Sequence, residues 1–183
     1  MDRRAFLRTA GLGSVALALP ALGMPAAALA KGRDDGGHDD DDATILEFKR
    51  MAPVTGPFVG AANPIRGVPG GGLPWIISEG RGELSADGHL EVRVRGLVLA
   101  RMAPVPANLQ GVNPVPNFRA IVSCLSIDAM GNPTTVNVTT DPFPASTTGD
   151  AEIEAWVSLP HPCIAPIVFV TSPTGAWFAA TGA

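Results

Sequence analysis

The sequence predicts an all-β fold, either an antiparallel β-sandwich or an open barrel of about seven to nine short strands. The 21 Gly and 18 Pro among 183 residues indicate many turns and short elements. Several segments alternate apolar and polar residues with a period of two. After residue 30 no segment has the 3.6-residue apolar period of an amphipathic helix.

The first strands are expected at residues 44–50 and on both sides of a tight turn at Asp87-Gly88. An Asp-Gly pair between two β-prone arms is a strong signal for a hairpin. In the second arm, apolar and charged side chains take opposite faces, as they do in a half-buried strand. The apolar face consists of Leu90, Val92 and Val94, and the charged face of Glu91, Arg93 and Arg95.

The second half of the chain continues this pattern. Residues 118–128 are apolar on both faces, which predicts an inner strand. Further strands are expected at 134–140, 151–159, 163–172 and 176–182. Pro166 predicts an edge, a bulge or a strand boundary, because proline cannot donate a hydrogen bond to the ladder. The Gly/Pro-rich segments 51–74 and 101–117 are expected to be long loops.

The first 30 residues have the three-part layout of an export signal: a charged head, an apolar middle and a small-residue end. Arg3, Arg4, Phe6 and Leu7 match the Arg-Arg-x-Phe-Leu core of the twin-arginine signal, which this segment resembles. Cleavage is expected after Ala30, and the protein is expected to be secreted, periplasmic or at the cell surface. The alternative is an uncleaved membrane anchor, although several Gly and Pro residues make this segment a poor span.

The resemblance to the twin-arginine signal has one further implication. That export route carries folded proteins, often with a cofactor already inserted. A bound cofactor would fit this route, although some organisms also send cofactor-free proteins this way.

Residues 31–43 hold six Asp, one His and three Gly, with no apolar residue before Ala43. Such a segment cannot bury a core face, so an extended, solvated tether is expected. The alternative is cation binding through Asp34, Asp35, His38 and residues 39–42. The spacing of these residues does not match the calcium-loop pattern. The remaining segment, 44–183, is expected to form a single β-rich domain.

One short stretch resembles a known repeat. The turn at 86–88, followed by the strand 90–97, resembles the repeat unit of chordin-type domains over about 15 residues. The His-containing segment that usually follows in that family is missing, so the resemblance implies β architecture alone.

Motifs for metal or nucleophilic chemistry are absent from the sequence. Its three histidines, His38, His89 and His161, are each expected to be solvated loop residues. Neither H-E-x-x-H nor C-x-x-C occurs, and there is no G-x-S-x-G elbow. We therefore expect no cofactor and no catalytic metal. The net charge of −4 argues against a nucleic-acid partner.

Glu152, Glu154 and Trp156 share the outward face of one predicted strand and are the surface-binding candidates. The two carboxylates would lie about 6.5–7 Å apart along the strand. That spacing is also found between the carboxyl groups of inverting glycosidases. The ordinary interpretation is the solvated face of an amphipathic strand. A loop is expected to cover Trp156; if exposed, its ring would form a platform for a sugar or a partner.

Two cysteines in an exported chain predict one disulfide, Cys124–Cys163. The alternative is a pair of buried free thiols, because a chain that folds before export does so in a reducing compartment.

The leading functional hypothesis is a non-catalytic exported β-domain that binds a protein, a surface polymer or itself. One alternative is an extracytoplasmic hydrolase with dispersed carboxylates at Asp150, Glu152 and Glu154. A second alternative is a cofactor or metal carrier, suggested by the export route. Contact with a membrane is expected only through an uncleaved signal.

Overall fold

A computed structural model describes residues 43–182. The twin-arginine motif, the cleavage site at Ala30 and residues 31–42 of the predicted tether lie outside the described residues.

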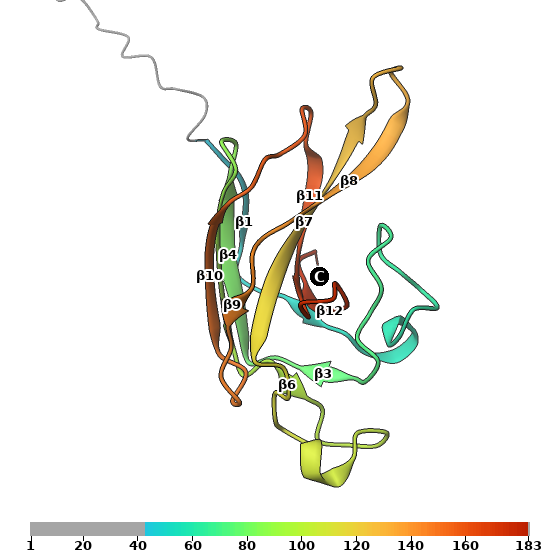
Figure 1. Ribbon diagram of the computed structural model, residues 1–183, viewed down its shortest axis with the longest axis vertical. Helices are drawn as coiled ribbons and strands as arrows, with labels where there is room; N and C mark the ends of the chain where they lie inside the picture. Colours follow the sequence, from blue (N-terminus) through green and yellow to red (C-terminus); the bar gives the residue numbers. More distant parts are fainter. Residues whose placement is uncertain (1–42, 183) are drawn as a thin grey trace, which may run out of the picture. The chain divides into compact units, whose positions relative to one another are not determined.

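Residues 43–182 form an all-β, sandwich-like fold of twelve strands in three antiparallel sheets (Figure 1). The only helical elements in this range are two short 3-10 turns, η2 (Gly56–Phe58) and η3 (Ala107–Leu109). Eight strands have four or more residues and four have two, so the number of substantial strands agrees with the sequence prediction. No helix in the described part of the chain is long and apolar enough to cross a membrane.

The first sheet carries the predicted Asp87-Gly88 hairpin. Its two arms pair with Leu84 opposite Leu90, and Gly88 adopts a φ of +93°, which favours glycine. In order across the sheet, the strands are β1 (Thr44–Phe48), β4 (Glu79–Ser85), β5 (His89–Arg95) and β10 (Ala151–Trp156).

The second sheet is built around the long strand predicted to be internal. β7 (Asn117–Ile127) pairs with β11 (Ile164–Thr171) on one side and with β8 (Pro133–Thr139) on the other. The strands outside β11 are β12 (Trp177–Ala180) and β2 (Ala52–Pro53), and β9 (Phe143–Pro144) pairs with the start of β7. A small third sheet joins β3 (Trp75–Ile76) to β6 (Val98–Leu99).

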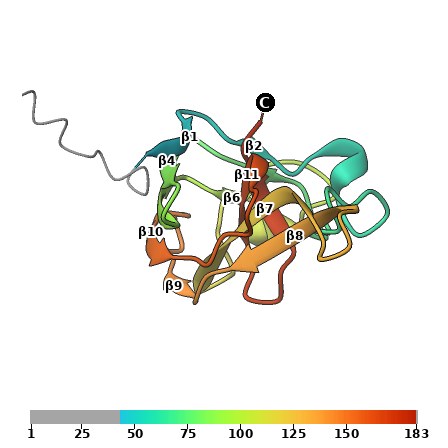
Figure 2. The same ribbon diagram turned by 90° about the horizontal axis from the view of Figure 1, so that it is seen from above.

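The core lies between the first two sheets. Figure 2 shows β1, β4 and β10 on one side of the molecule and β7, β8 and β11 on the other. Leu90, Val92 and Val94 are buried, as their alternation predicts, and belong to the same apolar cluster as Phe118 and Phe169 of the second sheet. The outward side chains of β5 and β10 are thereby left facing solvent.

The two Gly/Pro-rich segments are more integrated than the loop prediction implied. Val54 and Val68 in the first segment and Val105 in the second are buried in the core cluster. The Val54 N–H also donates to the Phe178 carbonyl (2.8 Å), which continues the pairing of β2 with β12. Apolar residues between the prolines therefore complete the core.

The predicted disulfide joins Cys124 and Cys163. Cys124 is fully buried on β7, and Cys163 immediately precedes β11. The pairing of β11 with β7 is irregular between Ile164 and Ile167, which confirms the irregularity predicted at Pro166.

Candidate functional site

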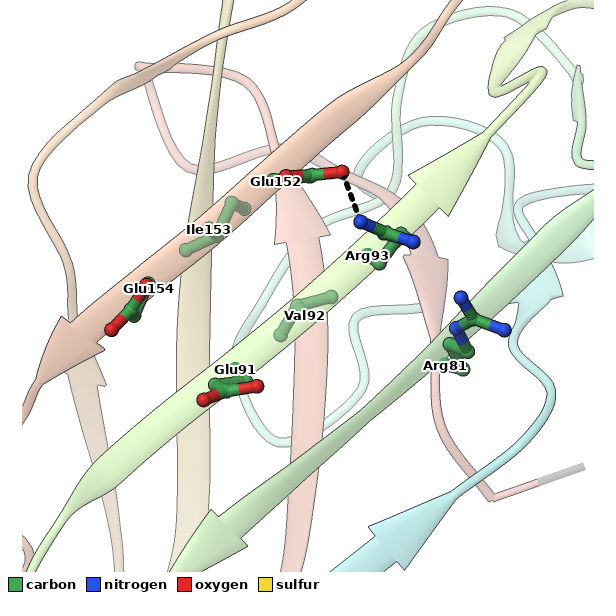
Figure 3. A pocket seen from close by; sticks show the side chains of 7 residues that line it. All are labelled: Arg81, Glu91, Val92, Arg93, Glu152, Ile153 and Glu154. Atoms are coloured by element: carbon green, nitrogen blue, oxygen red, sulfur yellow. Dashed lines mark ion pairs between the residues drawn. The ribbon is translucent and has the colours of Figure 1, made fainter.

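The candidate site is the outer face of the first sheet, where β5 and β10 lie side by side. Strand alternation sends their charged side chains to solvent and their apolar side chains to the core. Figure 3 shows Glu152 and Glu154 on β10 beside Arg93 and Glu91 on β5, with Arg81 on β4 beyond them. A shallow hollow of about 250 Å³ lies among these side chains.

Strand register arranges the charges in rows that cross the sheet. One row places Arg81 beside Arg93 and Arg93 beside Glu152. The next row contains only glutamates, one from each strand. From β1 to β10 they are Glu47, Glu83, Glu91 and Glu154. Like charges directly opposite each other destabilise a sheet, so this row carries an electrostatic cost.

Glu152 is held by two arginines. Its Oε1 lies 2.6 Å from Nη2 of Arg93 and 2.7 Å from Nη2 of Arg95. The hydrogen bond from Arg95 and the charge of Arg93 hold the pKa of Glu152 below its ordinary value of 4.5. Glu152 is therefore ionised at neutral pH and serves as an acceptor for the two guanidinium groups.

Asp150, named in the hydrolase alternative, has a structural role at the start of β10. Its carboxylate accepts hydrogen bonds from the Gly96 N–H (3.0 Å) and the Thr148 hydroxyl (2.8 Å). These bonds, that of Gly96 first, lower the pKa of Asp150 below its ordinary value of 3.8. They tie the turn before β10 to the end of β5.

His89 is part of the site, contrary to the expectation of a solvated loop residue. It is the first residue of β5, and its side chain is only 23% exposed. Its Nε2 lies 3.9 Å from Oε1 of Glu91 and 3.7 Å from Oε1 of Glu154. One ligand atom from each of these three residues can be chosen so that all lie within 4.8 Å of one another.

Trp156 is exposed, so the expectation that a loop covers it is wrong. Its side chain is 70% exposed and stands opposite His89 in the β5–β10 pairing. The two rings lie 4.7 Å apart between centroids, at an interplanar angle of 33°. One face of the indole is therefore supported by the imidazole.

A second hollow, of about 500 Å³, adjoins Trp156. Its polar side chains are Asp87 from the hairpin turn, and Ser158 and His161 from the segment after β10. His161 is an exposed loop residue, as predicted, whereas His38 lies outside the described residues. The hollow therefore places hydrogen-bonding groups beside an exposed aromatic ring.

Comparison with protein-family models, with curated proteins and with solved structures found no match to this chain.

Proposed function

We propose that the protein is an exported, non-catalytic β-domain that binds a surface polysaccharide through the outer face of its first sheet. Trp156 is the anchor of this site. The observation that carries the proposal is the 70% exposure of a tryptophan supported from behind by His89. An aromatic ring held in one orientation presents a large apolar area at little entropic cost.

The chemistry around Trp156 fits a sugar chain. The apolar face of a sugar ring can stack on the indole, while its hydroxyls take hydrogen bonds from polar groups at the edge. Asp87, Ser158 and His161 supply such groups in the adjoining hollow. Further along the sheet, Glu154 and Glu91 line the hollow of about 250 Å³ and offer additional hydrogen-bond acceptors. Glu154 lines one hollow and Trp156 lines the other, and the two residues are neighbours on the outward face of β10. The site therefore suits an extended polymer.

The hydrolase alternative receives less support from the same residues. A glycosidase needs one carboxylic acid that stays protonated, which requires a raised pKa. The arginines around Glu152 lower its pKa instead.

Sedimentation with insoluble polysaccharides tests the proposal. The full chain is mixed with cellulose, chitin and purified cell-wall peptidoglycan, and the bound fraction is measured. We expect binding to at least one of them, and Trp156→Ala to weaken it by about 30-fold, since an anchoring aromatic typically contributes about 2 kcal/mol. Met130→Ala is the matched control, because Met130 is 84% exposed but lies in the turn between β7 and β8. Equal retention of both variants would contradict the proposal.

Export through the twin-arginine route is the second part of the proposal. The match of Arg3, Arg4, Phe6 and Leu7 to the signal core supports it. Replacing both Arg3 and Arg4 by Lys should leave the precursor inside the cell, and the mature wild-type protein should begin at Lys31. Undiminished export of the double variant would contradict this route.

A further inference from the structure

We propose that His89, Glu91 and Glu154 form a binding site for a divalent transition metal such as Zn²⁺ or Cu²⁺. The metal site shares Glu91 and Glu154 with the face proposed to bind sugar, but metal binding there does not depend on the proposed function. Its ligands are one ring nitrogen and two carboxylate oxygens, which suit these metals.

The spacing of the three ligands is close to that of a tetrahedral zinc site. Ligand atoms about 2.1 Å from a tetrahedral metal lie about 3.4 Å from each other. Here Nε2 of His89 lies 3.7 and 3.9 Å from the two glutamate oxygens. The three atoms all fall within 4.8 Å of one another. Glu91 and Glu154 are both exposed, so small rotations of their side chains bring the oxygens to the required distances.

The imidazole is oriented before any metal binds. Trp156 covers it at a centroid distance of 4.7 Å, and it is only 23% exposed. The His89 backbone N–H donates to Oδ1 of Asp87 (2.9 Å), which holds the start of β5 against the hairpin turn. The ring therefore points Nε2 toward both carboxylates with little freedom left to lose on coordination.

The surrounding charges favour a bound cation. In the neighbouring row, the charge of Glu152 is matched by Arg93 and Arg95. In the glutamate row, the ion-pair partners among residues 43–182 are Lys49 for Glu47 and His89 for Glu91 and Glu154. Glu83 has no partner within that part of the chain. A divalent ion at His89 would offset the repulsion between adjacent carboxylates.

The ligand set predicts the order of metal preference. One imidazole and two carboxylates should bind Cu²⁺ most tightly, followed by Zn²⁺ and Ni²⁺. Ca²⁺ and Mg²⁺ should bind much more weakly, because Ca²⁺ takes six to eight oxygen ligands and Mg²⁺ an octahedral oxygen shell. Three protein ligands leave at least one coordination position for water or for a ligand group.

Isothermal titration of Zn²⁺ into the full chain at neutral pH measures the site. We expect one Zn²⁺ per chain at this site, and a loss of affinity of at least tenfold in both His89→Gln and Glu154→Gln. His161→Ala is the matched control, because His161 is an exposed loop histidine outside the proposed ligand set, and His38→Ala tests the Asp-rich segment. Both control variants should bind Zn²⁺ with the wild-type affinity. Unchanged Zn²⁺ affinity in His89→Gln, or its loss in His38→Ala, would overturn the proposal.

Tryptophan fluorescence tests the location of the bound ion without relying on the measured affinity. Cu²⁺ quenches an indole at short range, so saturating Cu²⁺ should quench the emission of Trp156 in the wild type. Trp156→Phe should still bind Cu²⁺ in the titration but lose that share of the quenching. The thermal unfolding midpoint of each metal-free variant shows that it is folded. Equal quenching in wild type and Trp156→Phe would place the ion elsewhere and refute the assignment.

Discussion

Removing the Cys124–Cys163 disulfide should destabilise the domain by about 4 kcal/mol. The bond joins residues 39 apart in the sequence, with their Cα atoms 4.9 Å apart. In the chain-entropy account, closing a loop of about 40 residues lowers the entropy of the unfolded chain by about 13 cal/mol/K. At 25 °C this corresponds to about 4 kcal/mol, a large share of the 5–15 kcal/mol typical of a domain.

Urea unfolding of three forms measures this contribution: the oxidised wild type, the reduced wild type and the Cys124→Ala/Cys163→Ala variant. Both the reduced protein and the double variant should be less stable than the oxidised wild type, and their thermal midpoints should lie at least about 8–16 °C lower. The double variant controls for unwanted effects of the reductant. Because Cys124 is fully buried, the small cavity left by its replacement adds to the loss in that variant. A loss below about 1 kcal/mol in both forms would refute the entropic account.

Three further substitutions test the structure around the site. Asp150→Asn should destabilise the domain at neutral pH. Folding lowers the pKa of Asp150, so its carboxylate stabilises the domain above pH 3.8, and this stabilisation is lost as the pH falls through the pKa of the folded protein. In urea unfolding, the difference in unfolding free energy between wild type and variant should therefore disappear below the pKa of the folded protein. Gly88→Ala should destabilise by about 1–3 kcal/mol, because a Cβ there meets the Val157 carbonyl oxygen and φ is +93°; a thermal midpoint equal to that of the wild type would contradict this. Glu83→Gln should raise the unfolding midpoint at low salt by relieving repulsion in the glutamate row, and the gain should vanish in 1 M salt.

The sequence was sufficient for the longer strands and for the faces that they bury, but not for the short strands β2, β3 and β9. The Asp87-Gly88 turn, the inward set Leu90, Val92 and Val94, and the disulfide follow from local patterns and composition, and the structure confirms each. These features depend on residues close in the chain or on the only two cysteines present.

The candidate site could not be predicted in the same way. His89 and Trp156 meet because β10 pairs with β5, and they are 67 residues apart in the chain. The glutamate row likewise depends on the register of four strands, which alternation alone does not specify. The hairpin did indicate that His89 begins a strand and shares the outward face of Glu91, and this was the available signal against treating it as a loop residue.

The exposure of Trp156 allows the most direct test of sugar binding. The chain has three tryptophans, and Trp75 and Trp177 are only 2% and 3% exposed. Iodide should therefore quench mainly the emission of Trp156. We predict that cellohexaose, chitohexaose or soluble peptidoglycan fragments will shift this emission to the blue and protect it from iodide, and that Trp156→Phe will abolish the iodide-sensitive share. If none of these sugars changes the emission or its quenching, the polysaccharide-binding account is wrong.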